Sequence, residues 1–128
     1  MKTRSLLAAL AIAAFGATGA FAADKVTVPS EAAIAAADVP ADSVIVNINK
    51  MKYETPEVTI KAGQTVTWIN LEAMPHNVDF VKGVVGENEL KGVMLKKGQA
   101  FSVTFNEAGT YDYHCTPHPF MRGKVIVE

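Results

Sequence analysis

The segment from Cys115 to Met121 gathers three side chains that bind soft metal ions. Cys115, His118 and Met121 follow the spacing C-x2-H-x2-M, so a thiolate, an imidazole and a thioether fall within seven residues. Soft sulfur together with imidazole is the ligand set that suits copper, and its softness favours copper over zinc. A lone cysteine or methionine is usually a packed apolar side chain. The conjunction of all three in one turn instead predicts a metal site.

A second imidazole has to come from elsewhere in the chain. Only His76 and His114 remain. Neighbouring side chains in a strand point to opposite faces, so His114 should face away from Cys115. His76 is therefore the better candidate, and Pro75 before it restricts the backbone. Two histidines and a cysteine with a weak axial methionine form a blue-copper electron-transfer site. The predicted ligands are His76, Cys115, His118 and Met121.

Three further residues are predicted to support these ligands. Pro117 follows Cys115 by two and has no backbone N–H, so one donor to the cysteine sulfur is missing. We expect the backbone N–H of Asn77 to reach that sulfur and its side chain to bind Thr116, since partners of metal ligands orient them. The alternative for Asn77 is an ordinary turn asparagine.

Apolar residues flank His118 and predict a docking face for partner proteins. An apolar ring around a partly exposed ligand, with an arginine at the rim, is typical of such a surface. A surface histidine that loses its metal bond can take a proton, so we also expect His118 to leave reduced copper as the pH falls. The predicted docking residues are Met74, Pro75, Met94, Pro117, Pro119, Phe120 and Arg122.

Short alternating stretches separated by glycines must position these side chains. Apolar and polar residues alternate at 44–48, 58–60, 66–68, 101–105, 111–114 and 124–127. This pattern predicts an all-β Greek-key sandwich or barrel of about eight to nine strands. Residues 30–37 begin with a serine before an alanine run, which favours one capped helical turn.

Composition and the first residues predict one exported domain. The 128 residues carry a net charge of −1, which offers no basic surface for nucleic acid, and one cysteine, which excludes an internal disulfide. Basic residues, an apolar stretch and Ala20-Phe21-Ala22 predict a signal peptide over 1–22, with cleavage after residue 23 as the alternative. The remaining domain, 23–128, would carry a net charge of −3, with no second apolar segment able to span a membrane.

Two stretches resemble the cupredoxins, the blue copper proteins: MPHN at 74–77 and, very closely, YDYHCTPHPFMRGK at 111–124. The likeness is greatest to members with this short ligand loop. The resemblance implies one type 1 copper ion cycling between Cu(I) and Cu(II), and a monomeric periplasmic carrier of single electrons. It implies methylamine dehydrogenase as electron donor and a c-type cytochrome as acceptor. It also adds Met51 to the docking residues.

Two other functions stay open at this point. A copper carrier or storage protein would share the ligands but exchange the metal. An enzyme would use Cys115 with a histidine as nucleophile and base, and it would need a third, orienting residue that no motif supplies. Cu(II) bound to a cysteine thiolate is intensely blue, so a colourless copper complex would exclude the blue-copper hypothesis.

Overall fold

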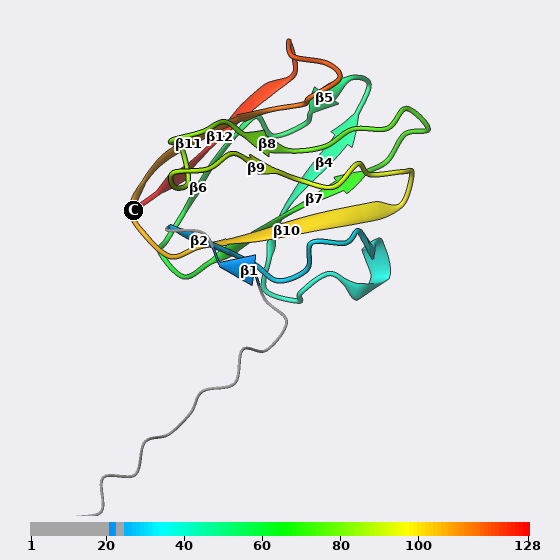
Figure 1. The fold of residues 1–128 in the computed structure, drawn as a ribbon. Coiled ribbons are helices and arrows are strands. Elements are labelled where there is room, and N and C mark those ends of the chain that lie inside the picture. Colours follow the sequence, from blue (N-terminus) through cyan, green and yellow to red (C-terminus); the bar gives the residue numbers. More distant parts are fainter. Residues whose placement is uncertain (1–20, 23–24) are drawn as a thin grey trace, which may run out of the picture.

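Two β-sheets pack face to face in the computed structural model, which describes residues 21–22 and 25–128 (Figure 1). The first sheet contains β1 (Phe21–Ala22), β2 (Val26–Val28), β3 (Ile34–Ala35), β4 (Val44–Asn49), β5 (Lys52–Tyr53), β7 (Thr65–Asn70) and β10 (Gln99–Phe105). The second contains β6 (Glu57–Ile60), β8 (Asp79–Phe80), β9 (Leu90–Lys91), β11 (Gly109–His114) and β12 (Arg122–Val127). The predicted signal peptide lies outside the described residues, except for the two that form β1.

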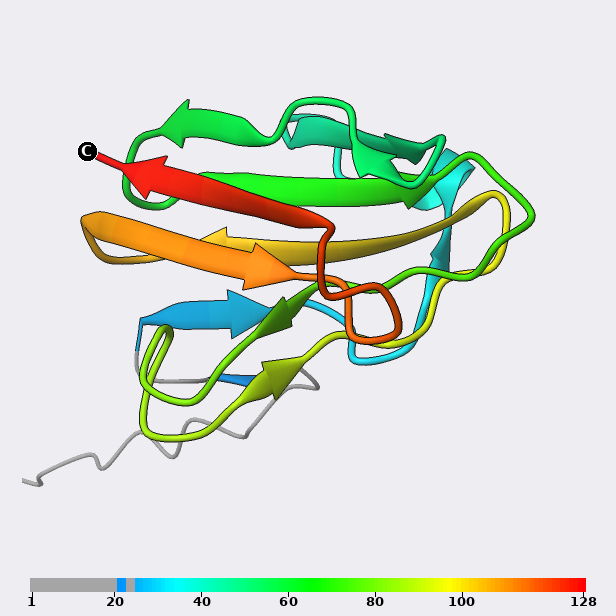
Figure 2. The same cartoon turned by 90° about the horizontal axis from the view of Figure 1, so that it is seen from above.

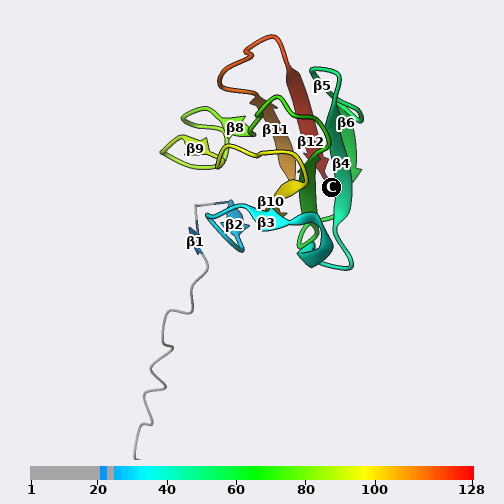
Figure 3. The ribbon, with the colours of Figure 1, turned by 90° about the vertical axis from the view of Figure 1, so that its right-hand side faces the viewer.

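The strand order shows that the chain crosses repeatedly between the sheets. The first sheet runs β1-β2-β10-β7-β4-β5, with β3 also on β10, and the second runs β6-β12-β11-β8-β9. Figure 3 shows β8 and β9 of the second sheet standing opposite β1 and β2 of the first. Most pairs are antiparallel, as expected, but β4 pairs with β7 and β6 with β12 in parallel. A parallel pair needs a crossover connection, and short stretches of alternation do not reveal it.

An aromatic cluster fills the space between the sheets. Trp68 of β7 meets the ring of Tyr113 of β11 edge to face, with centroids 5.1 Å apart. Phe80 packs against both rings, at 6.2 Å from Trp68 and 5.6 Å from Tyr113. Burial of these large rings contributes apolar surface that holds the two sheets together. Trp68 belongs to the strand that ends at Asn70, and Tyr113 belongs to the strand that leads to Cys115.

The predicted all-β sandwich is confirmed, with differences in detail. All six alternating stretches form strands. The twelve strands of the described residues exceed the predicted number because five have only two residues. The predicted helical turn at 30–37 is wrong: Ile34–Ala35 pair with β10, and only Ala36–Asp38 form a 3-10 turn without a side-chain cap. Pairing with a neighbouring strand outweighed the helix propensity of the alanines. Among the described residues, no helix is long and apolar enough to cross a membrane.

Loops with the predicted chemistry gather at one end of the sandwich. Figure 2 shows the turn between β11 and β12 (orange to red) away from the C-terminus, near the loops that follow β7 and β9. A β-bridge between His76 and Leu95 joins those two loops. At the other end, the backbone N–H of Ala62 donates to the carbonyl of Glu128.

Candidate metal centre

Three of the predicted ligands lie together. The ligating atoms of His76, Cys115 and His118 all lie within 4.8 Å of one another, and this is the one such group among the described residues. Nδ1 of His76 lies 3.7 Å from Sγ of Cys115, and Nδ1 of His118 lies 3.6 Å from it. Both imidazoles thus direct the same nitrogen toward one sulfur. A single metal ion fits among these three atoms.

The segment from Cys115 to Met121 is a compact turn closed by its own backbone. The N–H of Cys115 donates to the carbonyl of Met121, that of His118 to Cys115, and that of Met121 to His118, at 2.9 to 3.2 Å. Cys115 and Met121 are buried, His118 is half-buried, and Pro117 is exposed. The C-x2-H-x2-M spacing therefore places both sulfur side chains inward and the imidazole at the surface.

His76 is held by a different kind of structure. The chain leaves β7 at Asn70, whose side-chain amide donates to the carbonyls of Met74 and Leu95, both at 2.9 Å. The backbones of His76 and Leu95 then exchange two hydrogen bonds, at 2.7 and 3.3 Å. The imidazole of His76 is completely buried. This ligand candidate is fixed by contacts with residues distant in sequence.

The side chain of Asn77 connects the two ligand-bearing segments. Its Oδ1 accepts the backbone N–H of Thr116 at 2.8 Å, and its Nδ2 donates to Oγ1 of Thr116 at 2.9 Å. Oγ1 of Thr116 in turn donates to Asp79 at 3.0 Å. Asn77 is completely buried. This is the contact between Asn77 and Thr116 that the sequence suggested, and it fixes the chain on both sides of the cysteine.

The thiol of Cys115 is shielded from solvent. Burial raises its pKa above the usual range, while the backbone N–H groups of Asn77 and His118 act in the opposite direction. Pro117, between Thr116 and His118, contributes no such donor. A metal that binds thiolate must therefore displace a proton from Cys115, so metal uptake releases protons.

His114 stands apart from the cluster, as its neighbouring position in the strand suggested. Its Nε2 lies 3.8 Å from Oδ2 of Asp79, and its side chain is partly exposed. Asp79 therefore contacts Thr116 and lies near His114.

Most of the predicted docking residues are exposed. Met74, Met94 and Phe120 are exposed by 49, 40 and 70%, which is high for such large apolar side chains. Met51 is half-buried and lines a groove together with Phe120 and Arg122. The remaining docking residues, Pro75, Pro117 and Pro119, are exposed.

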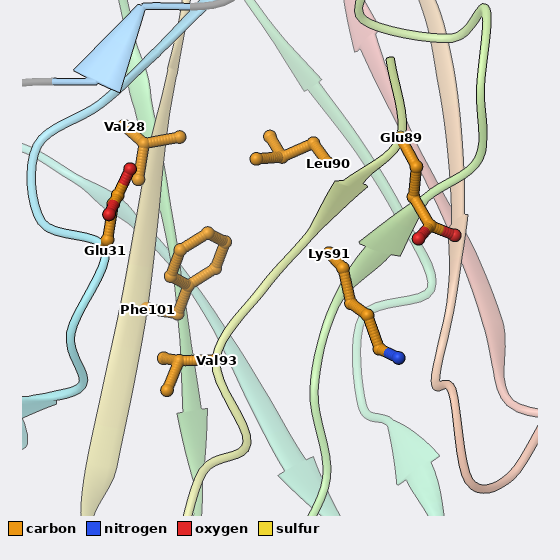
Figure 4. A pocket seen from close by; sticks show the side chains of 7 residues that line it. All are labelled: Val28, Glu31, Glu89, Leu90, Lys91, Val93 and Phe101. Atoms are coloured by element: carbon orange, nitrogen blue, oxygen red, sulfur yellow. The ribbon is translucent and has the colours of Figure 1, made fainter.

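A second hollow lies on the flank of the sandwich, between β2 and β10 on one side and β9 on the other. Figure 4 shows its apolar side chains converging, while the acidic and basic ones stand at the rim. None of the predicted site residues lines it. Its lining residues are Val28, Leu90, Val93 and Phe101, with Glu31, Glu89 and Lys91.

Glu72 is a site residue that the sequence did not reveal. Its Oε1 lies 2.5 Å from Nε2 of His76, on the side of the ring opposite to Cys115. The one signal was a carboxylate four residues before a candidate ligand, in a segment with no regular structure. Such spacing is common in loops and indicates no contact by itself.

Comparison with known proteins decides the family. The model of the copper binding proteins of the plastocyanin/azurin family matches residues 40–128, which include the whole cluster. The chain belongs to this family. Amicyanin of Paracoccus denitrificans is 69% identical over 99% of this chain and 96% of its own length. Amicyanin-alpha of Methylorubrum extorquens is 54% identical over 98% of this chain and 99% of its own.

Solved structures agree with this family assignment. The Cu(I) form of an amicyanin variant is 68% identical, with a TM-score of 0.81, covering 82% of this chain and all of that one. A reduced form of another variant gives the same values. This cupredoxin therefore carries one type 1 copper ion and is an electron carrier. The hypothesis of an enzyme with a Cys115 nucleophile is wrong, because the family assignment gives that thiol to a copper site.

Proposed function

We propose that the chain is a periplasmic one-electron carrier whose copper is bound by His76, Cys115, His118 and Met121. The observation that supports it best is the convergence of two imidazole Nδ1 atoms on one buried sulfur, at 3.7 and 3.6 Å. The donor set is soft and contains no carboxylate, which suits copper better than zinc or calcium. Met121 would be the fourth residue to hold the copper, since it is buried and closes the turn that begins at Cys115.

The residues of the site would act mainly by keeping the arrangement of the copper ligands rigid. Bound copper supplies the chemistry, a one-electron change between Cu(I) and Cu(II). The protein keeps the ligands in nearly one arrangement for both states, so little has to move when the electron arrives. The hydrogen bonds between Asn77 and Thr116 support this rigidity, because they join the segment of His76 to that of Cys115. Burial of Cys115 protects the thiolate from water and oxidants.

Electrons would enter or leave through His118. Of the two imidazoles it alone is partly exposed, and it lies 6.1 Å, centroid to centroid, from the ring of Phe120. The exposed apolar residues around it would form the docking face, with Met74, Met94 and Phe120 as the largest contributors. Methionines adapt readily to a partner surface. Arg122 at the rim would orient the partner more than hold it.

Methylamine dehydrogenase is the proposed donor and a c-type cytochrome the proposed acceptor. The support is the likeness to amicyanins, which reaches 69% identity and extends over nearly the whole chain. The docking face fits a transient partner, because it combines a small apolar patch with a charged rim.

Export to the periplasm would follow cleavage of residues 1–22, or of 1–23, leaving a single monomeric domain. The charge pattern and the Ala20-Phe21-Ala22 site support a signal peptide. The solved amicyanin chains, covered in full by 82% of this chain, are consistent with a shorter mature form. Mass spectrometry of the exported protein measures the cut, and an uncut chain would contradict it.

Two measurements test the function. Purified protein loaded with Cu(II) should be intensely blue. The Cys115→Ser variant should lack this colour, because a hydroxyl replaces the thiolate. Rapid mixing with reduced methylamine dehydrogenase should bleach the blue protein, and a reduced partner that leaves it blue would exclude this donor. The second candidate is a storage protein. It would release copper readily to a chelator, and no reduced redox protein would bleach it.

A further inference from the structure

The carboxylate of Glu72 has three donors, and they come from two parts of the chain. Its Oε2 accepts the backbone N–H of Lys50 at 2.8 Å, and its Oε1 accepts that of Met51 at 3.0 Å. The same Oε1 lies 2.5 Å from Nε2 of His76. One side chain thus joins the turn between β4 and β5 to a proposed copper ligand.

That turn is strained without help. Lys50 and Met51 have φ angles of 53° and 59°, in the left-handed region that side-chain-bearing residues rarely adopt. Two-residue turns of this kind between strands favour Asn-Gly, and neither position here is glycine. Asn49 supplies one acceptor, since its Oδ1 also takes the N–H of Lys50 at 3.0 Å. Glu72 supplies two acceptors for this turn, because it accepts the backbone N–H groups of both strained residues.

The ring of His76 has both nitrogens committed. Nδ1 faces Sγ of Cys115, and Nε2 faces Glu72. A carboxylate can only accept, so Nε2 must carry the proton and Nδ1 is left free for a metal. A carboxylate behind a ligating histidine fixes its tautomer and ring orientation. The imidazole is completely buried, while Glu72 remains about one-fifth exposed, so water can solvate part of the charge.

We propose that Glu72 is a positioning residue that makes the β4–β5 turn and the His76 ligand one rigid unit. It holds Nδ1 of His76 ready for copper before the metal arrives. It also connects the ligand to Met51, a residue of the proposed docking face, so that a partner pressing on Met51 acts on the copper ligand. This inference rests on the proposed function, since it takes His76 to be a copper ligand.

The test compares Glu72→Ala and Glu72→Gln with Glu87→Gln, which removes an exposed carboxylate elsewhere. In Glu72→Ala the amides of Lys50 and Met51 should exchange faster with solvent, and ¹⁵N spectra of the metal-free protein should show a mixture of His76 tautomers. Copper should be lost to a chelator about tenfold to a hundredfold more readily, the usual cost of removing such a partner. Glu72→Gln keeps an acceptor but no charge, so its effects should be smaller and in the same direction. Glu87→Gln should match the unsubstituted protein.

A second arm separates the turn from the ligand. Lys50→Asn with Met51→Gly installs the preferred turn residues, so in the Glu72→Ala background it should restore slow amide exchange at 50 and 51. The His76 tautomer mixture and the copper loss should persist. The inference would be overturned if both Glu72 variants kept the amide exchange rates, the single His76 tautomer and the copper retention of the unsubstituted protein. Failure of the unsubstituted protein and of Glu87→Gln to turn blue with Cu(II) would instead overturn the proposed function.

Discussion

The two histidines of the cluster lie in segments built in opposite ways. His76 is completely buried, its backbone pairs with Leu95, and a carboxylate stands behind its ring. His118 belongs to a short turn closed by local hydrogen bonds, lies between two exposed prolines, and is partly exposed itself. Their Nδ1 atoms nevertheless lie at almost the same distance from the cysteine sulfur.

This difference assigns different roles to two chemically identical ligands. The segment of His76 holds its ligand in a fixed position, since hydrogen bonds with several loops hold it in place. The turn from Cys115 to Met121 provides the edge of the site, because its imidazole reaches the surface. Electron exchange needs both: a rigid ligand set and one ligand close to the partner.

The largest expected effect contrasts the two ligands directly. His76→Gly and His118→Gly should both lose the blue absorption of the Cu(II) protein. Added imidazole should restore it in His118→Gly, because the vacated position opens to solvent, but not in His76→Gly, where the position is sealed. An absorbance titration with imidazole measures this. His114→Gly is the control and should stay blue, and equal rescue of both cluster variants would contradict the contrast.

Removing the hydrogen bonds by which Asn77 joins the segment of His76 to that of Cys115 should lower the stability of the fold. Asn77→Ala deletes two hydrogen bonds to Thr116 and one to the carbonyl of Gly92 in a fully buried place. The free energy of unfolding of the metal-free protein should fall by about 2–3 kcal/mol, since buried partners are left unpaired. Denaturant unfolding measures it. Asn106→Ala removes an exposed hydrogen bond to Thr27 and should cost less than about 0.5 kcal/mol. Equal losses would show that Asn77 is no special link.

The last effect appears only at alkaline pH and concerns Tyr113, which packs on Trp68. Burial raises its pKa to about 12, with the Trp68 indole acting in the opposite direction. Below the unfolded-state pKa of about 10, both states keep the proton and the free energy of unfolding does not depend on this group. Between about pH 10 and 12 only the unfolded chain ionises, so up to about 2–3 kcal/mol of stability is lost. Tyr113→Phe should show a shallower alkaline decline in unfolding experiments, and an identical slope would contradict the assignment.

Much of the fold was predictable because its strands carry regular alternation. In β6, for instance, Val58 and Ile60 are buried while Glu57 and Thr59 are exposed. The two-residue strands β8 and β9 were not predictable, since two residues cannot show a period. The stretch 30–37 misled because helix propensity is a local property and pairing with β10 is not.

The cluster itself was partly predictable for a similar reason. The spacing of Cys115, His118 and Met121 is local, so one turn brings them together whatever the rest of the chain does. His76 followed by elimination, because the chain holds three histidines and the one at 114 adjoins the cysteine. Glu72 gave no usable signal, since its partners are 4, 21 and 22 residues away and two of them are backbone amides.

The sequence by itself determined the ligand types, the compact turn that carries three of them and the alternation that produces strands. Each of these depends on residues close together in the chain, where spacing fixes geometry. Only the tertiary structure decided that His76 meets the sulfur of Cys115, that one imidazole is buried and the other exposed, and that Glu72 stands behind the buried one. Those outcomes depend on how distant strands pair and pack, and the energy of that packing is shared among many residues and encoded by none of them alone.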